Sequence, residues 1–256
     1  MAANSTKQFI TWDLNPKVVG MILENNKDLC VERIKSYFGP FESRVMRKDT
    51  YLKKYGKLQP GYTGSFFEKY SINSDRSIFD GNDVSAAISL SITGESFWVT
   101  SLLNEKINLG SISKFDYEHC ISKVDNNFFD QQELIEVYKQ LVKLNGISSV
   151  TASKLLASKR PNLFPIFDNS VSSLFKRPNG VSWQKKCSDL DYLDWCKSWQ
   201  HIMGDSKVRT LLTQISKESN SSCQPLRVLD VIFWLEGDCR KNRKNGNECE
   251  LLKLTM

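Results

Sequence analysis

A glycine-centred turn and an aspartate that follows it closely have the residue types and the spacing to do chemistry. Both lie between Leu144 and Val171, in the segment LNGISSVTASKLLASKRPNLFPIFDNSV. Gly146 can adopt the positive φ that ends one helix, and Ser148 can cap the next helix. Backbone N–H groups at the start of that second helix would face outward and form an anion site without a specific side chain. A backbone phosphate of a nucleic-acid duplex would fit such a site.

The aspartate of this segment is Asp168, which lies between the apolar LFPIF and the sequence NSVSSLF. An aspartate in this position ordinarily caps a helix. The same geometry would hold a carboxylate, fixed by helix N–H groups, at the edge of the groove that the hairpin faces. We therefore expect Asp168 to cap a helix over residues 169–176 and to be the candidate catalytic group.

Two helices must position the turn. The segment FDQQELIEVYKQLVKL has apolar residues at helical spacing, and Asp130 with Glu133 is its expected capping box. Ile147 is expected to plug between the two helices, and Ala152 to let them approach closely. Basic residues near the turn would strengthen the hold on a phosphate: Lys143, Lys154, Lys159 and Arg160. The alternative is an ordinary helical hairpin with a solvated basic face.

Helical periodicity also dominates the rest of the chain. A first helix is expected to follow Asn15-Pro16 and to end before Gly39-Pro40, a buried helix to start at Asp80 or Asp83, and another to start near Ser96. Residues 41–70 mix basic, aromatic and glycine residues and indicate a loop or a small strand pair. Further helices are expected over 149–158, 188–203, 206–217 and 224–236. The expected fold class is mainly α, with a small irregular or β N-terminal element.

No repeat or low-complexity linker divides the chain, so we expect one compact unit with peripheral segments. The expected regions are an N-terminal helix with a basic and aromatic stretch over 1–79, a helical core over 80–238 with its hairpin at 134–158, and a basic tail over 239–256.

Composition limits the class of protein. The chain has 256 residues, of which 40% are hydrophobic, enough for a sizeable core. Its net charge of +6 permits contact with polyanions without requiring it. Neither a secretory signal nor a membrane-spanning run is visible, so a cytoplasmic protein with no membrane partner is expected. The seven cysteines form no CxxC pair and indicate reduced thiols, and with only two histidines no metal or other cofactor is expected.

The segments LNGISSVTASKLL and FPIFDNSV resemble the signature of the helix-hairpin-helix DNA glycosylase superfamily. In that family a Gly-hydrophobic-Gly-x-x-Thr-Ala turn is followed by Val-Asp-Thr-His-Val, and Thr151 and Ala152 match its Thr-Ala pair. Upstream, AAISLSITGES is similar to a helix and turn ending Leu-Ser-x-Gln-x-Thr, with Ser89 and Thr93 matching. The resemblance spans residues 80–176. The segments YTGSFFE and LRVLDVIFWLEGD are also similar to an uncharacterised bacterial family.

The glycosylase resemblance implies a helix-hairpin-helix glycosylase-like fold, double-stranded DNA as the partner, and excision of a flipped base. It implies that Asp168 is catalytic, stabilising the positive charge that develops on the deoxyribose and orienting or deprotonating the attacking water. It also implies a set of residues that hold DNA: Lys143, Gly146, Ile147, Ser148, Thr151 and Lys154. No obligate protein partner is inferred.

The chain departs from the family pattern at several positions. Ser148 replaces the second hairpin glycine, and Val150 stands where bifunctional members carry a Schiff-base lysine. The absence of that amine implies a monofunctional enzyme that leaves an abasic site. The His-x-x-Arg after the aspartate is replaced by Ser170–Ser173, and the iron–sulfur loop is missing.

The resemblance also implies a wedge residue and a pocket around the flipped base. Ser91 replaces the wedge glutamine of the family, so another side chain must fill the gap in the duplex. Aromatic residues could wall the base pocket, although aromatics in helical proteins mostly pack inside. The candidates are Tyr62, Phe66, Phe67, Phe97 and Trp98.

Three functions therefore remain open from the sequence. The first is a monofunctional DNA N-glycosylase, the second a non-catalytic helix-hairpin-helix DNA-binding protein, and the third a helical scaffold whose hairpin binds protein. Within the first, alkylated bases and the bulky modified cytosines of phage genomes are both possible substrates, and the latter would suit a role in defence against phage.

Overall fold

The structure is a computed structural model, and it describes residues 12–38, 63–90, 92, 96–176, 183 and 189–241. Helices make up most of these residues, which confirms the mainly α class. The strands within them are β1 (Trp12–Asp13) and β2 (Phe175–Lys176), which pair in parallel. The expected loop or strand pair over 41–70 falls mostly outside the described residues, and its last part is helical.

The N-terminal region forms two helices where one was expected, α1 (Pro16–Asn25) and α2 (Lys27–Phe38). Asn15 caps α1 by accepting a hydrogen bond from Val18 N at 3.1 Å. The break falls at Asn26, whose buried side chain donates to Ile22 O at 2.8 Å. An asparagine that bonds its own backbone competes with the helix, which accounts for the interruption.

The next region carries the buried helix that the sequence predicts. Asp80 caps α5 and forms a capping box with Asp83, so both candidate caps take part. Helix α6 begins at Ser96 as expected. The elements are η2 (Thr63–Phe66), α4 (Phe67–Ile72), α5 (Gly81–Ser89) and α6 (Ser96–Asn104).

Short 3₁₀ turns lead into the hairpin. The expected capping box at Asp130 is wrong, because Gln131 occupies the N-cap position of α7 without a side-chain bond. Asp130 instead ends a 3₁₀ turn and forms an ion pair with Lys197. The elements are η3 (Gly110–Lys114), η4 (Ile121–Lys123), η5 (Phe128–Asp130), α7 (Gln132–Lys143) and α8 (Ser149–Lys159).

The remaining helices follow the predicted order, with one shortened. Asp168 caps α9, but this helix covers only Asn169–Ser172 because residues 175 and 176 pair with β1. Asp205 caps α11 by accepting from Val208 N at 3.0 Å. The other bounds are α10 (Asp189–Gly204), α11 (Ser206–Glu218) and α12 (Pro225–Lys241).

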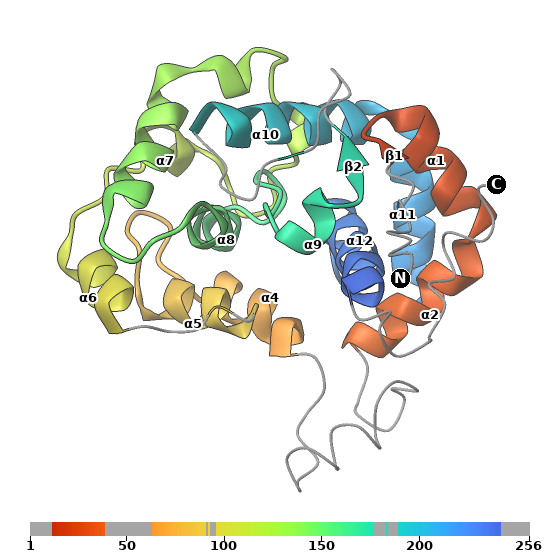
Figure 1. The fold of residues 1–256 in the computed structure, drawn as a ribbon, viewed down its shortest axis with the longest axis horizontal. Coiled ribbons are helices and arrows are strands. Elements are labelled where there is room, and N and C mark those ends of the chain that lie inside the picture. The colour runs from red at the N-terminus through yellow and green to blue at the C-terminus, as the bar shows by residue number, and fades with distance from the viewer. Residues whose placement is uncertain are drawn as a thin grey trace, which may run out of the picture.

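The helices form two groups around α8 and α10 (Figure 1). We call α4, α5, α6, α7 and α8 the hairpin group; in it α5 packs on α4 and α8, and α7 packs on α8. We call α1, α2, α11 and α12 the terminal group; in it α11 packs on each of the other three. The segment with α9 lies between the groups and packs on α12. Residues before 80 thus divide between both groups instead of forming one peripheral region.

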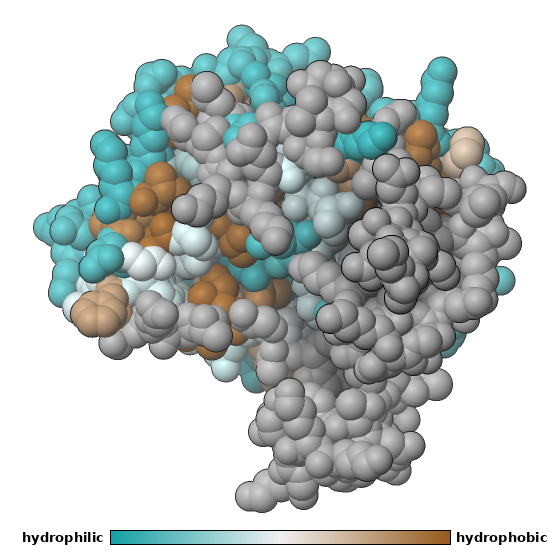
Figure 2. Space-filling model, viewed as in Figure 1, coloured by the Kyte–Doolittle hydropathy of each residue, from teal (hydrophilic) through white to brown (hydrophobic). Residues whose placement is uncertain are grey.

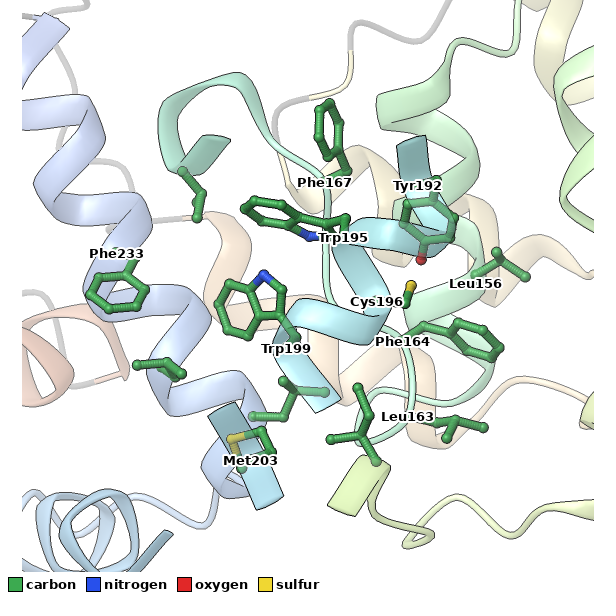
Figure 3. Packing of buried hydrophobic residues seen from close by; sticks show 14 of the residues in the cluster. Leu156, Leu163, Phe164, Phe167, Tyr192, Trp195, Cys196, Trp199, Met203 and Phe233 are labelled. Atoms are coloured by element: carbon green, nitrogen blue, oxygen red, sulfur yellow. The ribbon is translucent and has the colours of Figure 1, made fainter. Parts of the chain in front are cut away.

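Aromatic residues of α10 join the two groups (Figure 3). Trp195 packs edge-on against Phe167, with ring centroids 5.4 Å apart, and tilts against Trp199 at 5.6 Å. Trp199 in turn meets Phe233 of α12 at 6.2 Å. All four side chains are fully buried, so the residue that precedes Asp168 is anchored in the main core.

An ion pair inside the protein holds α8 against α5. The Lys159 and Asp83 side chains are both 0% exposed and form an ion pair. Ser158 Oγ also donates to Asp83 Oδ1 at 2.7 Å. Burying charges is costly unless each finds a partner, so this pair constrains how the two helices meet.

Two expectations about the whole chain have different outcomes. Within the described residues, no helix has the length and apolar character needed to cross a membrane. The cysteines at 30, 120, 196 and 223 form no disulfide, but Cys239 is disulfide-bonded, so the expectation of reduced thiols was wrong for that residue. Sequence spacing does not show which sulfur atoms the fold brings together.

We predict that Lys159→Met lowers the free energy of unfolding by about 3–5 kcal/mol, because it leaves the buried Asp83 carboxylate without a cation. Denaturant unfolding measures this change. Lys207→Met is the matched control, since Lys207 pairs with Glu24 on the surface at 2.6 Å, where a pair contributes at most about 1 kcal/mol. Equal losses in the two variants would contradict the role of the buried pair.

Candidate functional site

The hairpin turn has the predicted local geometry. Gly146 has φ +82°, and Ser148 caps α8 by accepting from Thr151 N at 3.2 Å. Ile147 is buried between the helices, as expected, and Thr151 is buried under the cap, so neither side chain is exposed for the DNA contact expected of it. Gly146, Ser148 and Lys143 are exposed. The first N–H groups of a helix have no acceptor inside that helix, so the turn retains the features of an anion site.

The hairpin turn packs against α6. Trp98 of this helix therefore lies beside the turn and away from the candidate site. A Cβ at Gly146 would lie 3.2 Å from Trp98 Cβ, so the residue at 146 must also be small. Trp98 is 1% exposed and belongs to the main hydrophobic core, so its expected role in the base pocket was wrong. Its neighbour Phe97 is 66% exposed.

None of the other residues expected in the base pocket is found to line a pocket in the described part of the chain. Phe66 is half-buried but does not line the pocket described below, and Phe67 is fully buried beneath it. Tyr62 and Ser91 lie outside the described residues.

Helix α8 is buried from Thr151 to its end at Lys159, which changes the roles of its basic residues. Lys154, Lys159 and Arg160 were expected to hold phosphate, yet each is at most 5% exposed. Arg160 donates to Lys159 O at 2.7 Å, and Lys154 Nζ donates to Leu90 O at 2.7 Å. Buried side chains with internal partners cannot meet a duplex backbone, so these three expectations were wrong. Of the basic residues expected around the turn, Lys143 is the one with an exposed side chain.

Asp168 is held from three sides. Its Oδ1 accepts from Ser170 N at 2.7 Å as the cap of α9. The preceding Phe167 is locked by its aromatic packing and by its N–H, which donates to Ser153 Oγ of α8 at 3.1 Å. The Lys154 Nζ lies 3.6 Å from Asp168 Oδ2. The carboxylate therefore has a fixed place, while its side chain remains 17% exposed.

A close approach between α12 and α9 completes this support. A Cβ at Gly237 would lie 2.1 Å from Ser170 O and 2.5 Å from Ser170 C. Only glycine allows α12 to pass this close to the backbone that Asp168 caps. Gly237 is thus part of the framework of the site although it is remote from it in sequence.

Asp168 lines a pocket at the junction of the two helix groups. The hairpin group contributes Ser89, Leu90 and Lys154, while Tyr37 of α2 and residues of α12 close the other side. The cavity is about 40 Å³, a few times the roughly 10–15 Å³ that one water requires and well below the about 300–1,000 Å³ of most ligand sites. A base could enter only if the walls move apart.

Lys154 and Asp168 form the charged floor of this pocket. Burial lowers the pKa of Lys154, and the nearby Asp168 carboxylate opposes that change. Desolvation in such a site strengthens every electrostatic interaction. The pair can therefore place a stable negative charge beside a bound group.

On the opposite wall, α12 contributes a network that the sequence analysis missed. Arg227 Nε donates to Glu68 Oε1 at 2.6 Å, Nη1 to Asp230 Oδ2 at 2.5 Å, and Nη2 to Tyr37 Oη at 3.1 Å. Its guanidinium also lies over the Phe67 ring, 5.0 Å from the centroid. The sequence signal for this network was the presence of two charged residues, Arg227 and Asp230, inside the largely apolar run LRVLDVIFWLEGD.

The described residues contain no group of His, Cys, Asp or Glu that could hold a metal ion. On the face shown in Figure 2, hydrophilic residues follow the outer edge near α7, and hydrophobic residues lie toward the middle, over α5 and α8.

We predict that Gly237→Ala displaces α9 and lowers the free energy of unfolding by about 1–3 kcal/mol, because the methyl group has no room against Ser170. Gly81→Ala is the control, since nothing lies within 4 Å of a Cβ there. Thermal unfolding measures the stability, and amide chemical shifts of residues 168–172 measure the displacement. An unshifted α9 in Gly237→Ala would contradict the framework role.

Comparison with known proteins gives one match. No curated protein and no solved structure matches the chain. Residues 48–237 match a protein family described as "Family of unknown function (DUF6308)". The match includes the hairpin, Asp168 and the pocket residues of α5, α8 and α12. Because it covers more than half of the sequence, the chain belongs to this family, DUF6308.

Proposed function

We propose that the protein is a monofunctional DNA N-glycosylase, which flips a damaged or modified base out of double-stranded DNA and hydrolyses its bond to the sugar. The observation that carries this proposal is the Asp168 carboxylate. It is fixed as a helix cap, lies 3.6 Å from the Lys154 ammonium and lines a pocket. The resemblance to helix-hairpin-helix glycosylases supports the same assignment.

Asp168 would act on the sugar side of the reaction. Cleavage of the base–sugar bond builds positive charge on the deoxyribose, and a preorganised carboxylate stabilises that charge. The same group can take a proton from the attacking water. Lys154 and Ser170 N would hold the carboxylate in place without solvent reorganisation.

The hairpin would hold the DNA. The exposed turn at Gly146 and Ser148 presents helix N–H groups to a phosphate, and Lys143 adds a positive charge beside it. Lys154, which was expected to contact DNA, lies instead beside the candidate catalytic group Asp168. Val150 stands where a lyase would carry its Schiff-base lysine, and this supports a reaction without a lyase step. The amine of Lys154 lies one helical turn further along α8.

The alternative is a non-catalytic DNA-binding protein, and the small cavity favours it. A pocket of about 40 Å³ does not accommodate a base as it stands. Base excision therefore requires an opening of the pocket walls, which DNA binding alone does not.

A cleavage screen tests the chemistry. Duplexes carrying different lesions or modified cytosines, and phage DNA with glucosylated bases, are incubated with protein and then treated with alkali. We predict alkali-dependent cutting of one substrate and a loss of at least about 100-fold in Asp168→Asn, because a group that stabilises transition-state charge typically contributes this much.

Asp205→Asn is the matched control, because Asp205 caps α11 in the same way and does not line the pocket. It should retain the wild-type rate. Salt-sensitive binding without cutting of any substrate would favour the non-catalytic alternative. Trapping of a covalent adduct by borohydride would overturn the monofunctional assignment and identify an amine such as Lys154 as a nucleophile.

The hairpin contact is tested by the salt dependence of binding. We predict that Lys143→Ala weakens binding to unmodified duplex and reduces the slope of log K against log salt by about 0.9, the value for one phosphate contact. Lys207→Ala on α11 is the control and should leave the slope unchanged. An unchanged slope in Lys143→Ala would remove this residue from the interface.

A further inference from the structure

Asp230 is an incompletely bonded carboxyl group in the wall of the pocket. It is 4% exposed and lines the same cavity as Asp168. Its Oδ2 accepts from Arg227 Nη1 at 2.5 Å, but its buried Oδ1 has no hydrogen-bond partner among the described residues. Buried polar atoms almost always have a partner, so an unsatisfied one beside a cavity is available to a group that enters the cavity.

The surroundings keep this carboxyl group in place. Arg227 is itself fixed by Glu68 of α4 and by Tyr37 of α2. The Asp230 side chain therefore has little freedom to turn its Oδ1 toward another protein group. A preorganised group of this kind suits a reaction step better than a flexible surface carboxylate does.

Several charges act on Asp230. Burial is the largest influence and raises its pKa to about 6, while Arg227 on its own helix lowers it. Across the pocket, Asp168 raises this pKa and Lys154 of α8 lowers it. Glu68 and Tyr37 reach Asp230 through Arg227. Asp230 thus carries a proton below about pH 6 and loses it as the pH rises through that value.

We propose that Asp230 is the proton donor to the leaving base, acting from the α12 wall while Asp168 acts on the sugar. This inference rests on the proposed glycosylase function. The C1′–N bond breaks and its electron pair goes to the base, which takes the Oδ1 proton of Asp230. Water adds to C1′ and gives a proton to Asp168, and exchange with solvent restores both carboxyl groups. The base leaves neutral and the sugar becomes abasic.

This role selects a class of substrate. A cationic N-alkylated base leaves as a neutral molecule and needs no proton, whereas an uncharged base would leave as an anion unless it is protonated. A proton donor therefore accelerates only the second kind of reaction. The pocket suits an uncharged base with a ring nitrogen or carbonyl acceptor, such as a modified cytosine, over a cationic alkylated purine.

Asp230→Asn tests the inference. The amide can still accept from Arg227 and donate to a ligand, but it cannot transfer a proton. Single-turnover excision is measured between pH 5 and 8 on the duplex that the wild type cuts and on a duplex with 7-methylguanine. We expect the wild-type rate on an uncharged base to fall about tenfold per pH unit above pH 6, and Asp230→Asn to be about 100-fold slower at pH 5.5 with a flat profile.

Duplex affinity should stay within about twofold of the wild type, since binding to phosphate does not involve this group. An Asp230→Asn enzyme with the wild-type rate and pH profile would overturn the inference, as would a wild type that cuts only 7-methylguanine. If the wild type cuts and Asp168→Asn does not, the proposed function stands whatever Asp230→Asn does. A wild type that cuts no duplex overturns both proposals.

A second measurement does not depend on folding of the variant. The carboxyl ¹³C signal of Asp230 in the wild-type protein should titrate near pH 6 and shift when the cleaved duplex binds. Titration near the ordinary aspartate value of about 4 would leave no proton to donate at the pH of the reaction and would also overturn the inference.

Discussion

The burial of α8 is the constraint on which the rest of the structure depends. A helix in the centre of the fold carries Lys154 and Lys159, and Arg160 follows it, so three cations must find partners inside the protein. Asp83 of α5 pairs with Lys159, and Asp168 pairs with Lys154. Because an uncompensated buried charge is strongly destabilising, these pairs decide where α5 and the segment before α9 can lie.

The candidate site arises from the same compensation. Asp168 neutralises a buried lysine and caps α9, and these two structural duties hold its carboxylate at the edge of a cavity. The cavity lies where the hairpin group meets the terminal group, so its geometry depends on contacts between helices far apart in sequence. Gly237 permits one of these contacts, the close approach of α12 to Ser170.

Two carboxyl groups face one pocket in different environments. Asp168 has a cation nearby, a backbone donor and some exposure, whereas Asp230 is more deeply buried and has one unpartnered oxygen. Different environments for two like groups are how acid and base roles are divided in one site. The proposed reaction uses this division, and under that proposal the two helix groups would have to separate around an entering base.

The sequence by itself determined the local features of the protein. Helical spacing, the caps at Asn15, Asp80, Ser148 and Asp168, and the positive φ of Gly146 depend on residues close together in the chain, so short-range rules suffice for them. The same rules failed at Asp130, where an ion pair with Lys197 from a distant helix replaced the expected cap.

Only the tertiary structure decided which side chains meet in the pocket. Lys143 and Lys154 look alike in sequence, yet one is exposed and the other is buried, because the packing around α8 determines which side faces solvent. The Arg227–Asp230 wall was not predicted at all, because its partners Glu68 and Tyr37 lie more than a hundred residues away, and the pairing of distant charges depends on the completed fold.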